Sequence, residues 1–362
     1  MKVFTVVGAR PQFIKAAIVS KGLKREGIEE FLVHTGQHFD ANMSEIFFKE
    51  LQIDPPHQNL HIRESSHAAQ TGKMLIALEE SMLEVKPDFV LVYGDTNSTL
   101  AAALAASKIH IPIVHVEAGL RSFNRKMPEE VNRIITDQLS ELLFSTSEVA
   151  TGHLLSEGIP KKNIFEIGDV MYDGVNHFKK IASSKEHPLG QDSKNPYILV
   201  TVHRAENTDC PIRLRAIFGA LIEVAQSHNV ILPLHPRTKM ALVQNELFEK
   251  VSKSLTIIEP VGYLDMLNLS QMAKLIVTDS GGLQKEAYYL KAPCVTLRDE
   301  TEWVETVECG ANLLMSPGEG AESIVEQITS SIDRGFQDKS LGSLYGGGKA
   351  VPALLEALKN NY

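Results

Sequence analysis

Residues 89–120 have the sequence FVLVYGDTNSTLAAALAASKIHIPIVHVEAGL, which predicts one complete β–α–β unit. Phe89–Tyr93 and Ile113–Val116 are short, largely apolar runs of the kind found in strands buried on both faces of a sheet. Residues 98–108 between them follow a helical pattern. Buried strands that alternate with helices indicate a parallel sheet with crossover helices, so this stretch places the chain in the α/β class.

The alternation continues on both sides of this unit and begins again after a polar stretch. Ser183–Pro196 is polar and contains two prolines and a glycine, which is typical of a linker or loop. Further strands are predicted at Val3–Val7, Phe31–His34, Leu142–Ser145, Tyr197–Thr201, Val230–Leu234, Thr256–Ile258, Leu275–Thr278 and Cys294–Leu297. We therefore expect two Rossmann-like, doubly wound domains around a central cleft, over residues 1–170 and 171–362. The last helix, near Val351–Lys359, could pack back on the first domain.

Length, charge and cysteine content exclude several classes of protein. The 362 residues exceed the roughly 250–300 residues that one core supports, which favours two domains. With 36 Lys and Arg against 45 Asp and Glu, the net charge of −9 offers no surface for nucleic acid or an anionic membrane. Cys210, Cys294 and Cys309 lack metal-ligand spacing and are typical of free thiols in a reducing cytoplasm.

No apolar segment has the pattern of a signal peptide or a membrane span. Arg10 and Pro11 interrupt the apolar run that starts at Met1, so this run predicts a first strand. No apolar stretch reaches the roughly 18–20 residues that cross a bilayer. We therefore expect a cytoplasmic protein without a metal ion and without a nucleic-acid or membrane partner.

Three acidic residues of the first domain are candidates for the site, and two of them directly follow predicted strands, where doubly wound sheets bind their ligands. Asp95 and Glu117 come directly after the two strands quoted above, and Glu129 stands beside Pro128 in the first turn of a predicted helix. Asp95 also suits a helix cap, and Glu129 suits the positive end of the helix dipole, so structural roles stay open. Close carboxylates raise one another's pKa, which leaves one acid and one base near neutral pH. The three residues are therefore a candidate acid–base cluster.

Cations follow the first strand of each domain. The sequence GARPQFIK carries Arg10 and Lys15 into a helix start, which is a candidate anion site, although solvated cations in an ordinary turn explain it equally well. His203, in VHRAEN, stands at the end of the first strand of the second domain. A structural hydrogen bond is the usual role of such a histidine, and its strand-end position also makes it a candidate for the site.

The segment LIVTDSGGLQKEA is the most specific motif that the residues give. Gly281 and Gly282 allow backbone N–H groups to approach a pyrophosphate, and the Ser280 hydroxyl adds a donor. Glu286 lies further along the following helix, where the natural partner of a carboxylate is the vicinal diol of a ribose. Arg298 ends the next strand and could reach the same anion. The alternative that this motif is only a tight turn into a helix stays open, but such a turn would not need the serine and the glutamate.

Together these motifs resemble the non-hydrolysing UDP-N-acetylglucosamine 2-epimerase family over nearly the whole chain. The matching pieces are GARPQFIK, YGDTNST, HVEAGLRS with PEEVNR, VHRAEN, and TDSGGLQKEA with LRDETE. The resemblance implies a glycosyltransferase-B-like fold, a homodimer, and inversion at C2 of a UDP-2-acetamido sugar without a cofactor. UDP would be eliminated to leave a glycal and then added back after C2 is protonated from the other face.

The resemblance also implies roles for the candidate residues. The carboxylates that would handle the C2 proton are Asp95, Glu117 and Glu129. The cations that would stabilise the departing diphosphate are Arg10, Lys15 and His203. The residues that would hold UDP are Ser280, Gly281, Gly282 and Glu286, with Arg298 nearby.

Departures from the family pattern leave the substrate open. The usual Arg-Pro-Glu is Arg-Pro-Gln here, at Gln12, and the usual His-Arg-Arg-Glu-Asn has Ala205 in its third place. With these changes the sequence resembles a subgroup that acts on UDP-2,3-diacetamido-2,3-dideoxy-glucuronic acid. Loss of a carboxylate at Gln12 would suit an anionic sugar if Gln12 lies near the sugar ring. Activation by a second substrate molecule also stays open, because Gln37 of the family's activator segment remains but Asp40 and Ser65–Ser66 do not reproduce the rest.

Three other functions stay open at the level of sequence. A glycosyltransferase of the same fold needs one base and an acceptor groove, so the acidic cluster argues against it. A hydrolysing epimerase differs in releasing the free sugar. A non-catalytic sensor of nucleotide sugars would not need the three carboxylates and His203.

Overall fold

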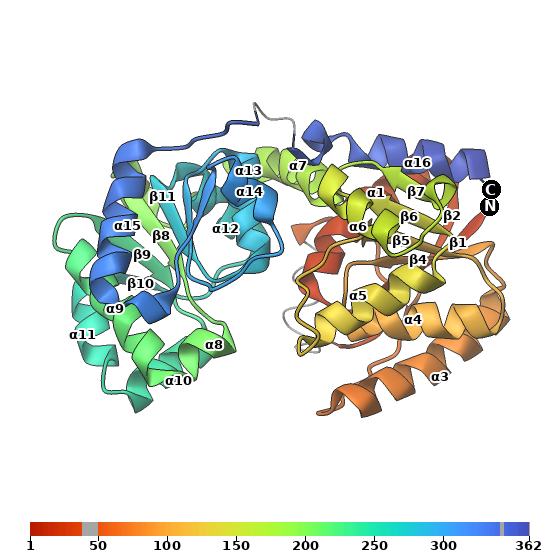
Figure 1. The fold of residues 1–362 in the computed structure, drawn as a ribbon, viewed down its shortest axis with the longest axis horizontal. Coiled ribbons are helices and arrows are strands. Elements are labelled where there is room, and N and C mark those ends of the chain that lie inside the picture. The colour runs from red at the N-terminus through yellow and green to blue at the C-terminus, as the bar shows by residue number, and fades with distance from the viewer. Residues whose placement is uncertain (38–49, 341–343, 362) are drawn as a thin grey trace. The chain divides into compact units, whose positions relative to one another are not determined.

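The computed structural model describes residues 1–37, 50–340 and 344–361 (Figure 1). These residues form two compact units: unit 1 is Met1–Gly174 with Ser343–Tyr362, and unit 2 is Val175–Gly342. The chain thus passes from unit 1 to unit 2 within helix α7 (Val170–Ser184) and returns to unit 1 near its C-terminal end.

Unit 1 contains a parallel sheet in the order β3-β2-β1-β4-β5-β6-β7. Its strands are β1 (Lys2–Val7), β2 (Glu29–His34), β3 (Gln58–Asn59), β4 (Phe89–Tyr93), β5 (Ile113–Ala118), β6 (Leu142–Ser145) and β7 (Ile164–Glu166). All five residues of β4 are buried, because helices cover both faces of the sheet. The order reverses between β1 and β4, which makes this edge the switch point where doubly wound sheets bind ligands.

The helices of unit 1 form two layers around this sheet. Its helices are α1 (Arg10–Arg25), α3 (His67–Val85), α4 (Asn97–Lys108), α5 (Pro128–Leu139), α6 (Glu148–Ser156) and α16 (Ala350–Asn361). Figure 1 shows α3, α4 and α5 on one face of the sheet and α1 with α16 on the other.

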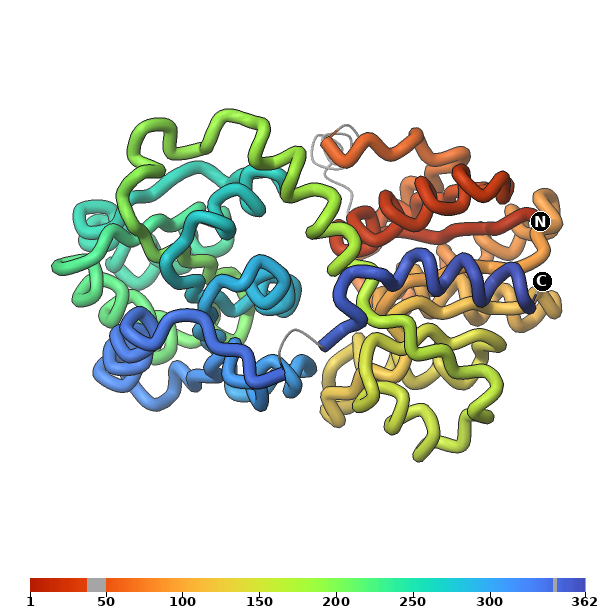
Figure 2. Tube along the Cα trace, turned by 90° about the horizontal axis from the view of Figure 1, so that it is seen from above, coloured from red at the N-terminus to blue at the C-terminus, as the bar shows by residue number. Residues whose placement is uncertain are grey.

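Helix α16 packs against α1 although more than three hundred residues separate them. A Cβ on Gly22 of α1 would lie only 2.9 Å from Leu355, so glycine permits this close approach. Asp173 accepts hydrogen bonds from the N–H groups of Ala350 (2.9 Å) and Val351 (3.2 Å) at the start of α16. Both chain ends consequently belong to unit 1 (Figure 2).

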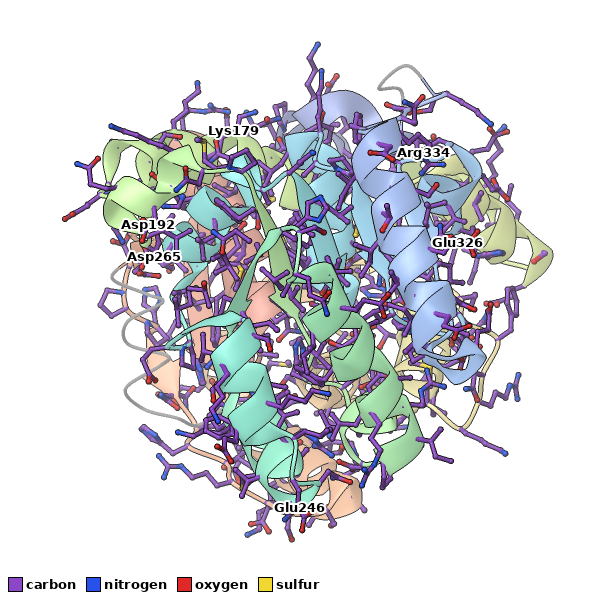
Figure 3. All side chains as sticks on the ribbon, turned by 90° about the vertical axis from the view of Figure 1, so that its left-hand side faces the viewer. Lys179, Asp192, Glu246, Asp265, Glu326 and Arg334 are labelled. Atoms are coloured by element: carbon purple, nitrogen blue, oxygen red, sulfur yellow. The ribbon has the colours of Figure 1, made fainter. Side chains whose placement is uncertain are left out.

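Unit 2 repeats the doubly wound pattern with the order β10-β9-β8-β11-β12-β13. Its strands are β8 (Tyr197–Thr201), β9 (Asn229–Pro233), β10 (Thr256–Ile258), β11 (Leu275–Thr278), β12 (Cys294–Thr296) and β13 (Asn312–Leu314). Its helices are α8 (Ala205–Thr208), α9 (Pro211–Val224), α10 (Pro236–Gln244), α11 (Phe248–Ser254), α12 (Tyr263–Met272), α13 (Gly281–Leu290), α14 (Val304–Glu308) and α15 (Ala321–Arg334). Helix α15 buries Ile324 and Ile328 and turns Glu326 and Arg334 outward (Figure 3).

The two strand orders confirm the prediction of two Rossmann-like α/β domains. Among the residues that the structure describes, no helix is long and apolar enough to span a bilayer. The same residues include no cluster of His, Cys, Asp and Glu that could hold a metal ion.

Candidate functional site

The switch point of unit 1 brings the loops after β1 and β4 together. β1 and β4 pair side by side, as do β4 and β5. The turn after β1 is very tight, because a Cβ on Gly8 would collide with the hydroxyl groups of Thr35 and Ser98. The predicted residues Arg10 and Asp95 therefore follow β1 and β4, and Glu117 lies at the end of β5 rather than after it, at the same edge of one sheet.

Glu117 occupies an unusual backbone position. The register between β5 and β6 shifts between Val116 and Ala118, and Glu117 has a φ of +74°. A bulge of this kind next to a site redirects a side chain. The redirected carboxylate forms a buried ion pair with Lys15 of α1, and only 7% of Glu117 and 5% of Lys15 are exposed. A predicted carboxylate and a predicted cation are thus joined.

Asp95 is held by two residues of α5. Its carboxylate accepts from Arg133 Nε at 2.9 Å and Nη2 at 2.8 Å, and its carbonyl accepts from Asn132 Nδ2 at 2.8 Å. Asp95 does not cap helix α4, since the Thr96 hydroxyl accepts from Thr99 N–H and serves as the cap. The capping alternative for Asp95 was therefore wrong.

Glu129 and Glu130 have different environments in the first turn of α5. Glu129 is exposed, and no hydrogen bond or ion pair links it to another residue of the described ranges; it lies three and four positions before Asn132 and Arg133, on their side of the helix. Glu130 is buried and accepts from Ser122 N–H at 2.8 Å and from Arg133 Nη1 at 2.9 Å. Burial alone would raise the pKa of Glu130, but the Ser122 hydrogen bonds and the Arg133 charge outweigh it and lower the pKa. Glu130 thus fixes the loop, and Glu129 is the carboxylate that a ligand can reach.

Asp279 organises the switch point of unit 2, where β8 and β11 are neighbours. Its carboxylate accepts from the N–H groups of His203 (3.0 Å) and Arg204 (3.0 Å) and from Asn207 Nδ2 (3.1 Å). The His203 ring lies beside it, with Nδ1 3.5 Å from Oδ1, and its side chain is 39% exposed. Asp279 therefore shapes the loop, while the His203 ring remains accessible.

The Ser-Gly-Gly turn begins helix α13 directly after Asp279. Ser280 is the N-cap, and its hydroxyl accepts from Leu283 N–H at 3.4 Å. A Cβ on Gly281 would lie 2.9 Å from Glu302 Oε1, whereas a Cβ on Gly282 would meet no atom within 4 Å. Arg298 is buried and pairs with Glu302 at 3.0 Å. The turn thus offers the N-terminus of a helix, with two arginines near Gly281, Arg204 and Arg298.

Two further polar residues of unit 2 are Glu286, a predicted site residue, and His235. Glu286 is buried on α13, with 7% of its surface exposed. His235 has a structural role, because it caps α10 by accepting from Arg237 N–H at 3.2 Å.

Comparison with known proteins places these motifs in a family. The model of the UDP-N-acetylglucosamine 2-epimerase family matches residues 21–359. The chain belongs to this family. UDP-2,3-diacetamido-2,3-dideoxy-D-glucuronate 2-epimerase of Pseudomonas aeruginosa is 51% identical over 99% of both chains, and UDP-N-acetylglucosamine 2-epimerase of Methanocaldococcus jannaschii is 43% identical over 99% of both. A crystal structure of the Methanocaldococcus jannaschii enzyme in complex with UDP-GlcNAc and UDP has a TM-score of 0.88 and 42% identity, covering 99% of this chain and 100% of that one.

Family membership confirms the predicted enzyme class and fold. The chain is an isomerase of the UDP-N-acetylglucosamine 2-epimerase type, and its two parallel-sheet domains are glycosyltransferase-B-like.

In this epimerase Gln12 is a loop-holding residue. Its Oε1 accepts from the N–H groups of Gly8 (2.7 Å) and Ala9 (3.1 Å), and its Nε2 donates to the Tyr93 carbonyl at 2.8 Å. A glutamate could not donate to that carbonyl. Gln12 therefore joins the turn after β1 to the end of β4.

Arg133 is the main residue of the epimerase site that sequence reasoning missed. Arg133 forms ion pairs with both Asp95 and Glu130. The sequence could have indicated it, because Arg133 comes four residues after Glu129 and the two residues therefore share one face of the helix. Gln37 of the activator segment accepts from Ser98 N–H at 3.0 Å, and Asp40 lies outside the described residues.

A cavity of about 470 Å³ lies elsewhere in unit 1 and is separate from these residues. Its wall includes residues at the N-terminal end of β2, opposite the strand ends that carry the site, such as Glu29 and Glu30. Desolvation there raises the pKa of Glu30, whose carboxylate accepts from Thr5 at 2.5 Å. Lys24 and Asp54 form an ion pair of 2.9 Å in the same wall.

Proposed function

We propose that this epimerase inverts C2 of a UDP-linked 2-acetamido sugar, with UDP-N-acetylglucosamine as substrate and UDP-N-acetylmannosamine as product. The observation that carries the proposal is the set of acidic residues at the switch edge of unit 1, where Glu117 pairs with Lys15 and Asp95 pairs with Arg133. The relatives named as UDP-N-acetylglucosamine 2-epimerases support the choice of sugar.

The proposed reaction begins with elimination. A carboxylate takes the proton from C2, the C2–H electron pair forms a C1=C2 double bond, and the C1–O bond breaks so that its electron pair leaves with UDP. The C2 hydrogen is weakly acidic, so breaking of the C1–O bond runs ahead and builds positive charge on the ring. Carboxylates that are already ionised and fixed stabilise that charge without rearranging. A proton then reaches C2 from the other face, and UDP adds back to C1.

The carboxylates divide by environment. Asp95 and Glu117 are tied to cations, which fixes their positions and makes them suited to stabilise charge or accept a proton. Glu129 is exposed in the first turn of α5 and is suited to exchange a proton. General acid–base assistance of this kind is worth about 10²–10⁴-fold in rate.

The proposal assigns UDP to unit 2. The N–H groups of Gly281 and Gly282, at the start of α13, would bind the diphosphate, because the N-terminus of a helix favours an anion. Ser280 and Arg298 border this turn, and Glu286 would accept from the ribose hydroxyls. His203, Arg10 and Lys15 would balance the diphosphate charge, and Lys15 would share its charge between the diphosphate and Glu117.

A second substrate is favoured by one comparison. The relative named UDP-2,3-diacetamido-2,3-dideoxy-D-glucuronate 2-epimerase is 51% identical over nearly the full length of both chains. The same elimination and addition would serve this sugar, since its C2 acetamido group and UDP are the same.

The deciding experiment incubates the purified protein with each UDP-sugar in deuterium oxide and follows C2 by NMR. Deuterium at C2 together with the epimer supports the proposal and identifies the sugar. No deuterium at C2 of either sugar overturns it. Release of UDP only when an acceptor is added would indicate a glycosyltransferase. Release of free N-acetylmannosamine would indicate a hydrolysing epimerase. Binding of a UDP-sugar without exchange at C2 would indicate a sensor.

We also propose a homodimer in the cytoplasm. Ile76 and Leu83 are 59% and 55% exposed on one face of α3, and an apolar face of this kind suits a second copy of the chain. The unpaired thiols of Cys294 and Cys309 are buried, as suits a reducing compartment. Light scattering that gives the mass of a single chain would contradict the dimer.

A further inference from the structure

A buried ion network lies in unit 1 directly behind the strand ends that carry Asp95 and Glu117. His115 of β5 and Asp137 of α5 are both 0% exposed, and Arg121 is 5% exposed. His115 Nδ1 lies 2.7 Å from Asp137 Oδ1, and Arg121 Nη2 lies 2.7 Å from Asp137 Oδ2. Arg121 also donates to both carboxylate oxygens of Glu157, at 2.7 and 2.6 Å.

This network holds the backbone on both sides of the acidic cluster. His115 Nε2 donates to the carbonyl of Gly94, at 2.8 Å, and Gly94 directly precedes Asp95. Asp137 Oδ2 accepts from Gly119 N–H at 3.2 Å, two residues after Glu117. Glu117 has a positive φ angle of 74°, which is strained for a residue with a side chain, so its backbone needs support from its surroundings.

The hydrogen-bond partners determine the protonation of His115. A carboxylate faces one ring nitrogen and a backbone carbonyl faces the other, and both groups are acceptors only. Both bonds form only if His115 carries a proton on each nitrogen. His115 and Arg121 then supply two positive charges against the carboxylates of Asp137 and Glu157, so that the buried network is electrically balanced.

We propose that the His115–Asp137 pair, as a buried imidazolium and carboxylate, is the positioning unit that keeps Asp95 and Glu117 in their reactive places. Neither residue touches the substrate in this proposal: His115 acts through the Gly94 carbonyl, and Asp137 acts through His115 and the Gly119 N–H. The inference rests on the proposed function, because it takes Asp95 and Glu117 as the reacting carboxylates.

The first test needs no substrate. In protein with ¹⁵N-labelled histidine at neutral pH, His115 should show two ring N–H protons that exchange slowly with solvent, because the ring is fully buried. Loss of these two signals in His115→Gln, or their shift in Asp137→Asn if the first variant does not fold, assigns them. A His115 ring with one unprotonated nitrogen overturns the proposal.

The second test separates positioning from folding. Asp137→Asn keeps the size of the side chain but removes the charge that faces His115 and Arg121. We expect kcat for C2 exchange to fall by about 10–100-fold, as when outer-shell partners are removed from other sites, with KM changed by no more than about two-fold. Glu30→Gln is the matched control, an acidic group at the opposite end of the same sheet, and its kcat should stay within about two-fold of wild type.

The outcomes distinguish the two proposals. If Asp137→Asn lowers only the melting temperature and keeps kcat, the network is structural and the inference fails. If wild-type protein exchanges no deuterium at C2, the proposed function fails, while the ring-proton measurement still decides whether the pair is charged.

Discussion

The buried pair of Lys15 and Glu117 gives a quantitative prediction about unit 1. Their side chains are 6% and 8% exposed, so each charge has little water around it. Lys15→Met keeps the apolar stem but removes the cation that faces Glu117, and Glu117→Gln removes the opposite charge. Breaking a buried pair from one side costs about 3–5 kcal/mol, a large share of the roughly 5–15 kcal/mol that stabilises a folded domain.

The double variant Lys15→Met with Glu117→Gln should recover part of this loss, because no uncompensated charge is left. We expect the loss in the double variant to be smaller than the sum of the single losses by about 2–3 kcal/mol. Urea unfolding followed by far-UV circular dichroism measures the free energy of unfolding. The single tryptophan, Trp303, belongs to unit 2, so its fluorescence shows in the same samples that unit 2 is unaffected. Single losses that add to within about 0.5 kcal/mol, or a shift confined to the tryptophan signal, would refute the reasoning.

Three further predictions concern the reaction, the UDP site and pH. Asp95→Asn should lower the rate of C2 exchange by about 10²-fold or more while UDP affinity stays unchanged, and turnover at the wild-type rate would remove Asp95 from the mechanism. The Cβ that Gly282→Ala adds would meet no protein atom within 4 Å, so the protein should keep or gain stability. Its affinity for UDP, measured by calorimetry, should fall about tenfold, and an unchanged affinity would mean that the turn does not hold UDP. Desolvation raises the pKa of Glu30 in the folded state, so its contribution to stability is complete below the pKa of the unfolded chain and is lost as pH rises through the folded pKa. Glu30→Gln should therefore raise the melting temperature at pH 8 and lose this advantage toward pH 4, and a constant difference across this range would contradict the assignment.

The sequence contained enough information to predict the fold and the strand ends of the site. Apolar runs such as Phe89–Tyr93 identify strands buried on both faces, and the residue after each strand can then be named without coordinates. Asp95, Glu117 and the Ser280 turn were found in this way. These predictions depend only on local pattern and on the rule for strand ends.

The contacts between distant segments could not be predicted. Lys15 and Glu117 are 102 positions apart, and their pairing depends on a bulge in β5 that no residue pattern announced. The role of His115 could not be predicted from the apolar strand that contains it, because its partner Asp137 comes from a helix that packs on the sheet. The bond from Gln12 to the Tyr93 carbonyl could not be predicted either, because Tyr93 belongs to a neighbouring strand.

The return of the chain to unit 1 has a consequence for biosynthesis. Unit 2 ends at Gly342, whereas unit 1 lacks α16 until Ala350–Asn361 has been translated. The surface of α1 that α16 will cover therefore stays exposed during translation of the whole of unit 2. A chain that stops just after residue 342 would release a complete second unit attached to an incomplete first one.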